Sequence, residues 1–172
     1  MSLLARGNVV LERVLARLLV GLVATMALTV IWQVATRLYS RLAGGLAWLP
    51  QLQPSQWTEE LAGFLLAWVA LLGAAYALRR GEHVGLDSLV NALQPRWQKA
   101  AARFAQACVL LFAAILVVGG GWLVRLTLEL GQTTPALHWS MGWVYAVAPL
   151  SGLLMLCFAA ERVFIDAGAH DA

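Results

Sequence analysis

The sequence predicts an all-α integral membrane protein with four transmembrane helices, cytoplasmic N- and C-termini and a short interfacial helix between spans two and three. The first observation is composition: 61% of the 172 residues are hydrophobic, 12% are charged and the mean hydropathy is +0.75. Soluble domains average about 45–50% apolar and about 25% charged residues. The second is that four apolar stretches contain no Asp, Glu, Lys, Arg or His, and charges lie close to each of them. We therefore expect a single membrane domain over residues 1–172.

The four stretches have the length of membrane-spanning helices. A helix needs about 20 apolar residues to cross a hydrocarbon core of about 30 Å. The predicted spans cover residues 18–36, 61–78, 105–124 and 141–160. Strands of a membrane barrel would alternate polar and apolar residues, whereas these stretches are apolar on every side. Helices also satisfy their own backbone polar groups in lipid.

The first span follows a basic N-terminal segment, as the apolar part of a secretory signal peptide does. Its apolar stretch is longer than the roughly 7–15 residues usual in such peptides. We therefore expect a retained signal-anchor helix rather than a cleaved signal.

The distribution of Lys and Arg predicts the orientation of the spans. Nine of the twelve basic residues lie on the side that the predicted spans give to both termini. They are Arg6, Arg13, Arg17, Arg79, Arg80, Arg96, Lys99, Arg103 and Arg162. The opposite side has only Arg37, Arg41 and Arg125. By the positive-inside rule both termini are cytoplasmic.

The loop between spans two and three contains a second apolar pattern. Leu86, Leu89, Val90 and Leu93 recur at helical spacing, and Pro95 follows them. A short helix with one apolar stripe lies in the plane of the membrane surface. We therefore predict an interfacial helix over residues 86–94.

The second span has a face of small side chains. Its members advance by three or four residues: Gly63, Ala67, Ala70, Ala74 and Ala77. Small residues let a neighbouring helix approach closely in lipid. The sequence predicts a helix-packing face and leaves open whether the neighbour belongs to this chain or to another.

Two acids, Glu59 and Glu60, precede the second span. Carboxylates in the first turn complement the positive end of the helix dipole. One acid is enough for that, so pairing with a basic residue of another subunit is the competing interpretation. Trp57 and further tryptophans (Trp48, Trp122, Trp139 and Trp143) lie near the same membrane surface. They fit an aromatic belt and also a platform for a partner protein.

The residues of metal, haem and catalytic chemistry are missing from the predicted spans. His83, His138 and His170 lie outside them, and Cys108 and Cys157 are isolated in apolar runs. No nucleophile–base pair, phosphate loop or metal-spaced Cys/His set occurs in the sequence. The sequence thus predicts no catalytic, cofactor-binding or metal-ligating residue and no enzyme activity. Its basic residues are spread over short loops, which argues against a nucleic-acid partner.

Carriers that couple transport to protons or ions place ionisable residues or broken helices near the membrane midplane. The four predicted spans contain no ionisable Asp, Glu, Lys, Arg or His. This favours an accessory subunit of a transporter. The alternative is a stand-alone structural protein or small channel with four spans.

Two strings of the sequence resemble a known family. They are Trp57-Thr58-Glu59-Glu60-Leu61 and Gly73-Ala74-Ala75-Tyr76-Ala77-Leu78-Arg79-Arg80-Gly81-Glu82-His83-Val84-Gly85-Leu86-Asp87. Together they resemble the DctQ-type small membrane subunit of tripartite ATP-independent periplasmic (TRAP) transporters. The resemblance implies structural or subunit-contact roles for the motif residues, which are Trp57, Glu59, Glu60, Gly73, Arg79, Arg80, His83 and Asp87.

The resemblance also implies partners and a location. It implies a multi-pass protein of the bacterial inner membrane, surrounded by membrane lipids and bound to a large membrane subunit on a separate chain. That large subunit would carry the sodium and substrate sites, and a periplasmic solute-binding protein would deliver an organic acid. This chain would brace the large subunit and would itself need no cofactor.

Overall fold

The computed structural model describes residues 3–42, 56–80 and 95–170. Their helices are α1 (Leu3–Leu42), α2 (Gln56–Arg80), α4 (Pro95–Glu129), α5 (Met141–Tyr145) and α6 (Val147–His170). The described residues contain no strand beyond an isolated bridge between Thr133 and Ser140. The predicted all-α class is confirmed.

Four stretches of these helices are long and apolar enough to cross a membrane: Val10–Tyr39, Gln56–Arg80, Arg103–Glu129 and Met141–Ala160. Each contains one of the four spans predicted from sequence. The helices extend beyond the charge-free segments because the flanking charged residues continue the same helical turns. The interfacial helix predicted over 86–94 lies outside the described residues. The cytoplasmic location of the termini and the single-domain assignment remain predictions.

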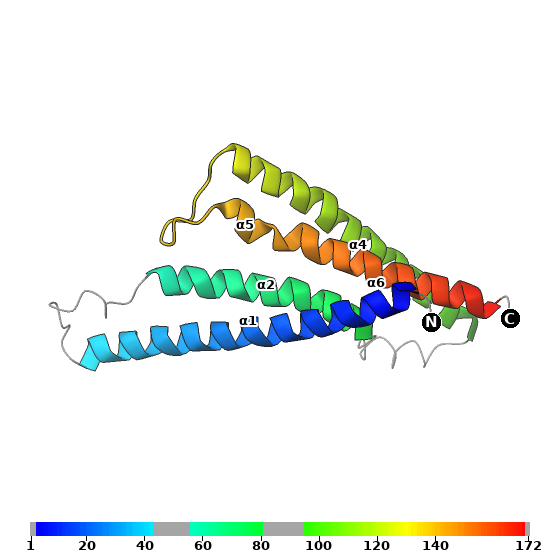
Figure 1. Cartoon of the computed structure of the whole chain (residues 1–172), viewed down its shortest axis with the longest axis horizontal. Helices are drawn as coiled ribbons and strands as arrows, with labels where there is room; N and C mark the ends of the chain where they lie inside the picture. Colours follow the sequence, from blue (N-terminus) through cyan, green and yellow to red (C-terminus); the bar gives the residue numbers. More distant parts are fainter. Residues whose placement is uncertain (1–2, 43–55, 81–94, 171–172) are drawn as a thin grey trace.

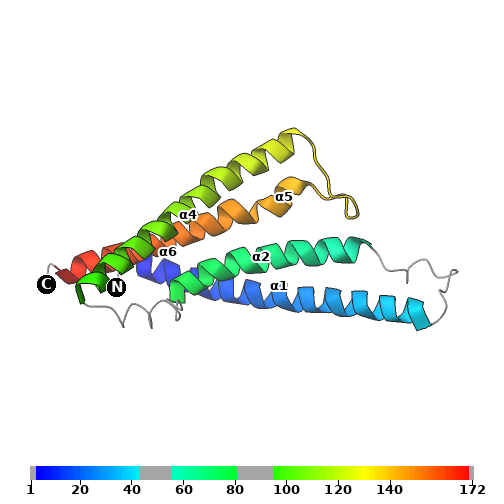
Figure 2. The ribbon, with the colours of Figure 1, turned by 180° about the vertical axis from the view of Figure 1, so that it is seen from behind.

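The helices form two antiparallel hairpins, one of α1 and α2 and one of α4 with α5 and α6. Figures 1 and 2 show them side by side in the order α1, α2, α6, α4, with the N- and C-termini at one end. We name this end the terminal end. The opposite end, with Leu42, Gln56 and the connection over residues 130–140, is the hairpin end. The two hairpins diverge towards the hairpin end (Figure 1).

Apolar side chains join the two hairpins through α2 and α6. One cluster of buried residues contains Leu15 of α1, Leu72 of α2, and Val147 and Phe158 of α6. A second contains Ala75 and Leu78 of α2, Ala113 of α4 and Met155 of α6. Phe158, Leu72, Ala75 and Ala113 are at most 1% exposed. The α2 residues of both clusters lie between Trp68 and Leu78, in the half of α2 nearer the terminal end.

Glycines bring α4 and α6 into close contact. A Cβ atom on Gly152 would lie 2.8 Å from the Ala113 carbonyl oxygen, and one on Gly120 would lie 2.8 Å from Pro149 Cδ. Only residues without a side chain fit at such short separations, which is how small residues promote helix association in lipid.

The fourth span is broken into α5 and α6 near Pro149, which has no N–H for the carbonyl of Tyr145. A hydroxyl of Ser or Tyr could donate to a carbonyl freed in this way. Ser151 instead donates to the carbonyl of Ala148. The indole Nε1 of Trp68 on α2 donates to the neighbouring Val144 carbonyl over 3.2 Å, which adds a polar link between the hairpins.

Replacing Gly120 by alanine should destabilise the protein. The new methyl group would meet the ring of Pro149 and the Cβ of Ala148, and overpacking of this kind costs about 1–3 kcal/mol. Thermal or denaturant unfolding in detergent measures the change. Gly119→Ala is the matched control because nothing lies within 4 Å of its added Cβ. Since alanine is the better helix former, Gly119→Ala should be neutral or stabilising. Equal stability of the two variants would contradict the packing described.

Candidate functional site: polar contacts at the two ends of the spans

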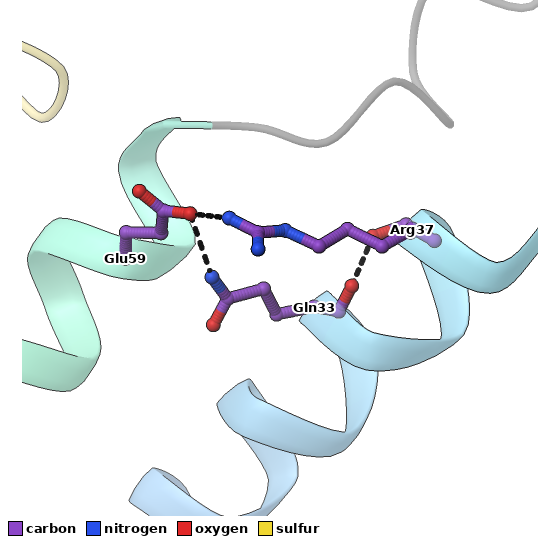
Figure 3. A network of polar contacts seen from close by, with 4 residues as sticks. Gln33, Arg37 and Glu59 are labelled. Atoms are coloured by element: carbon purple, nitrogen blue, oxygen red, sulfur yellow. Dashed lines mark hydrogen bonds and ion pairs between the residues drawn. The ribbon is translucent and has the colours of Figure 1, made fainter. Parts of the chain in front are cut away.

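Glu59 joins α2 to α1 at the hairpin end. Its Oε1 accepts a hydrogen bond from Gln33 Nε2 over 3.0 Å and forms an ion pair with Arg37 (Figure 3). Gln33 and Arg37 are four residues apart, so they lie on the same face of α1. The side chains of Arg37 and Glu59 are about half exposed, at 54% and 52%. An exposed pair of this kind contributes at most about 1 kcal/mol.

Glu60 joins α2 to the opposite hairpin. Its Oε2 accepts hydrogen bonds from the backbone N–H groups of Ala136 over 3.0 Å and Leu137 over 2.9 Å. Hydrogen bonds to a charged acceptor contribute about 1.5–3 kcal/mol each, more than those between neutral groups. The two consecutive acids thus contact two different hairpins.

The connection over residues 130–140 is closed by its own hydrogen bonds. Thr134 is fully buried; its N–H donates to the Trp139 carbonyl, and its Oγ1 accepts from the Trp139 N–H over 3.0 Å. Gly131 and His138 have positive φ angles of 61° and 55°. The left-handed conformation suits glycine and costs other residues about 1–2 kcal/mol. Thr134 therefore holds a turn that contains one unfavourable backbone conformation.

A second charged cluster lies at the terminal end. Glu12 of α1 forms ion pairs with Arg79 Nε over 3.6 Å and with Arg80 Nε over 3.4 Å. The guanidinium of Arg79 also lies 5.8 Å from the ring centre of Phe158, and that of Arg80 lies 5.2 Å from the ring centre of Tyr76. Cation–π contacts at such distances are attractive. The paired arginines of the sequence motif thus bind α2 to α1 and contact α6.

Most of the small-residue face of α2 is left uncovered by the described residues. Gly63, Ala67, Ala70 and Ala74 are exposed, and Ala77 is half-buried. A Cβ atom added to Gly63 or Gly73 would meet nothing within 4 Å. A neighbour for the exposed part of this face is thus absent from the described part of this chain.

Exposed indole rings lie at the hairpin end. Trp57, Trp122, Trp139 and Trp143 are 41–74% exposed. Their placement fits both interpretations, an aromatic belt and a platform, while Trp48 lies outside the described residues. His83 and Asp87 of the motif also lie outside them, so their contact roles remain predictions.

Sequence reasoning missed the partners of the motif residues. Gln33 and Arg37 close the first span at a spacing of four, and Glu12 is the only acid before that span. These signals mark possible partners, but they do not say which basic or acidic group each would meet. Among the described residues no group of three or more His, Cys, Asp or Glu could hold a metal ion.

The chain matches the family described as "Tripartite ATP-independent periplasmic transporters, DctQ component" over residues 26–167. It belongs to the DctQ family. The family places the chain among the membrane subunits of transporters, and its four apolar helices make it a multi-pass membrane protein.

Two relatives support this membership. The chain is 34% identical over 102 residues to the C4-dicarboxylate TRAP transporter small permease protein DctQ of Rhodobacter capsulatus. It is 30% identical over 106 residues to a putative TRAP transporter small permease protein of Haemophilus influenzae. These matches cover 59% and 62% of this DctQ-family chain but only 44% and 65% of the relatives' lengths.

A third relative matches over a longer part of the chain. The sialic acid TRAP transporter small permease protein SiaQ of Vibrio cholerae is 26% identical over 145 residues, 84% of this chain and 76% of the relative.

Replacing Thr134 by valine should destabilise the connection over residues 130–140. Valine keeps the shape but removes the acceptor of the Trp139 N–H, and the loss of one such hydrogen bond costs about 0.5–1.5 kcal/mol. Thr133→Val is the matched control because Thr133 is exposed, and its effect should stay within about 0.5 kcal/mol. Unfolding followed by tryptophan fluorescence compares the two variants. A greater loss of stability in Thr133→Val would refute this role of Thr134.

Proposed function

We propose that this chain is the small membrane subunit of a sodium-coupled, binding-protein-dependent importer of organic acids in the bacterial inner membrane. In this role it acts as the scaffold of a large transport subunit on a separate chain. Membership of the DctQ family supports the proposal. The names of two relatives, transporters of C4-dicarboxylate and of sialic acid, support an organic acid as the solute.

The positions of the charged groups support a scaffold role. The four predicted spans contain no Asp, Glu, Lys, Arg or His, whereas ion-coupled carriers place such groups near the midplane. The described acids Glu12, Glu59 and Glu60 lie near the span ends and have partners within the chain. Sodium and solute binding are therefore assigned to the large subunit, and this chain has no catalytic role.

The observation that carries the proposal is the exposed small-residue face of α2. Exposed positions of α1 bear small residues such as Gly21 and Ala24 as well as large ones such as Leu28. On α2, Gly63, Ala67, Ala70 and Ala74 follow one another at helical spacing and form a continuous stripe. Such a stripe permits close approach of another helix. We assign this face to the large subunit.

Enlarging this face should separate the two subunits. Ala70→Leu and Ala74→Leu place a bulky group between two close backbones, and about 1.4 kcal/mol of lost association energy lowers binding about tenfold. The measurement is co-purification of the variants with a tagged large subunit from co-expressing cells, together with solute uptake. Both should fall.

Ala114→Leu provides the control because Ala114 is an exposed alanine on α4, away from the stripe. It should co-purify and support uptake as the unmodified chain does. Circular dichroism of each variant alone checks that the helices persist. Unchanged assembly and uptake in Ala70→Leu and Ala74→Leu would overturn the assignment of this face.

A further inference from the structure

We propose that Glu60 is a latch that sets the separation of the two helical hairpins at the hairpin end. The inference concerns the chain's own conformation and does not rest on the proposed function. Apolar and polar contacts between the hairpins are unevenly distributed along α2.

The buried apolar clusters join the hairpins along the part of α2 nearer the terminal end. Within the described residues, the α2 members of both buried clusters lie from Trp68 to Leu78. Glu60 lies twelve residues before the buried Leu72, which is about 18 Å along a helix. The hairpins diverge over this distance (Figure 2). The buried apolar clusters therefore hold the hairpins together nearer the terminal end, and contacts around Glu60, where Thr58 is also buried, act at the hairpin end.

Polar contacts connect the two hairpins where they diverge. The Trp68 indole reaches the Val144 carbonyl close to the buried apolar clusters. Nearer the hairpin end, Glu60 accepts hydrogen bonds from the N–H groups of Ala136 and Leu137. Because these hydrogen bonds lie farther from the buried apolar clusters than the Trp68 contact does, they have more influence on the angle between the hairpins.

The partner of Glu60 is a rigid target. The hydrogen bonds of Thr134 with Trp139 and His138 close the turn that presents the two N–H groups. Both N–H groups point at one carboxylate oxygen, and a charged acceptor binds two donors more strongly than a neutral one. Because the turn leads directly into α5, holding the turn also holds the second hairpin.

Glu59 offers a matched control within the same helical turn. It has the same charge and size, but its partners Gln33 and Arg37 belong to α1, inside the first hairpin. Removing Glu59 should loosen the contact of α2 with α1 and leave the spacing between the hairpins unchanged.

The test compares Glu60→Ala, Glu60→Gln and Glu59→Ala in the full chain, reconstituted in lipid nanodiscs. Hydrogen exchange at Ala136 and Leu137 should be about tenfold faster in Glu60→Ala. It should be intermediate in Glu60→Gln, which keeps an accepting oxygen, and unchanged in Glu59→Ala. Glu60→Gln also serves as the test variant if Glu60→Ala does not accumulate.

A distance measurement separates a latch from a local contact. Spin labels at the exposed Leu66 of α2 and Leu130 after α4, with Cys108 and Cys157 replaced by alanine, report the spacing of the hairpins. The distance distribution should lengthen and broaden in both Glu60 variants and stay unchanged in Glu59→Ala. Faster exchange with an unchanged distance distribution would reduce Glu60 to a cap of the turn and overturn the latch. Unchanged exchange would also overturn it.

Discussion

The hydrocarbon core of the membrane is the constraint on which the rest of the structure depends. A charged group at its centre is costly, so the four spans contain only uncharged side chains. Polar recognition within the chain is consequently concentrated at the two ends of the spans. Glu12 with Arg79 and Arg80 acts at one end, and Glu59 and Glu60 act at the other. Between these ends the helices associate by close packing.

Close packing and polar contacts both hold the helices together, at different places in the structure. Gly120 and Gly152 bring α4 and α6 together, and the clusters around Leu72 and Phe158 join the two hairpins. The small-residue stripe of α2 remains exposed among the described residues, although it has the properties of a packing face. This exposed face is the basis of the proposal that the chain braces another membrane protein.

The four spans could be predicted from sequence because the bilayer fixes both the length and the polarity of a spanning helix. The partners of Glu59 and Glu60 could not. Capping of the second span and pairing with another subunit both fitted the sequence, whereas Glu59 contacts Gln33 and Arg37 of α1 and Glu60 contacts Ala136 and Leu137. Such partners depend on how the helices are arranged in space. The same holds for Trp68, whose indole donates to the Val144 carbonyl of the other hairpin.

In the proposed role this chain braces a transporter and does not itself move the solute. Reconstitution in proteoliposomes tests it most directly: the chain alone, the large subunit alone, and both together, each with the solute-binding protein and a sodium gradient. Uptake should rise well above the empty-liposome level only when both membrane subunits are present. Uptake by this chain alone, or full uptake by the large subunit without it, would contradict the account.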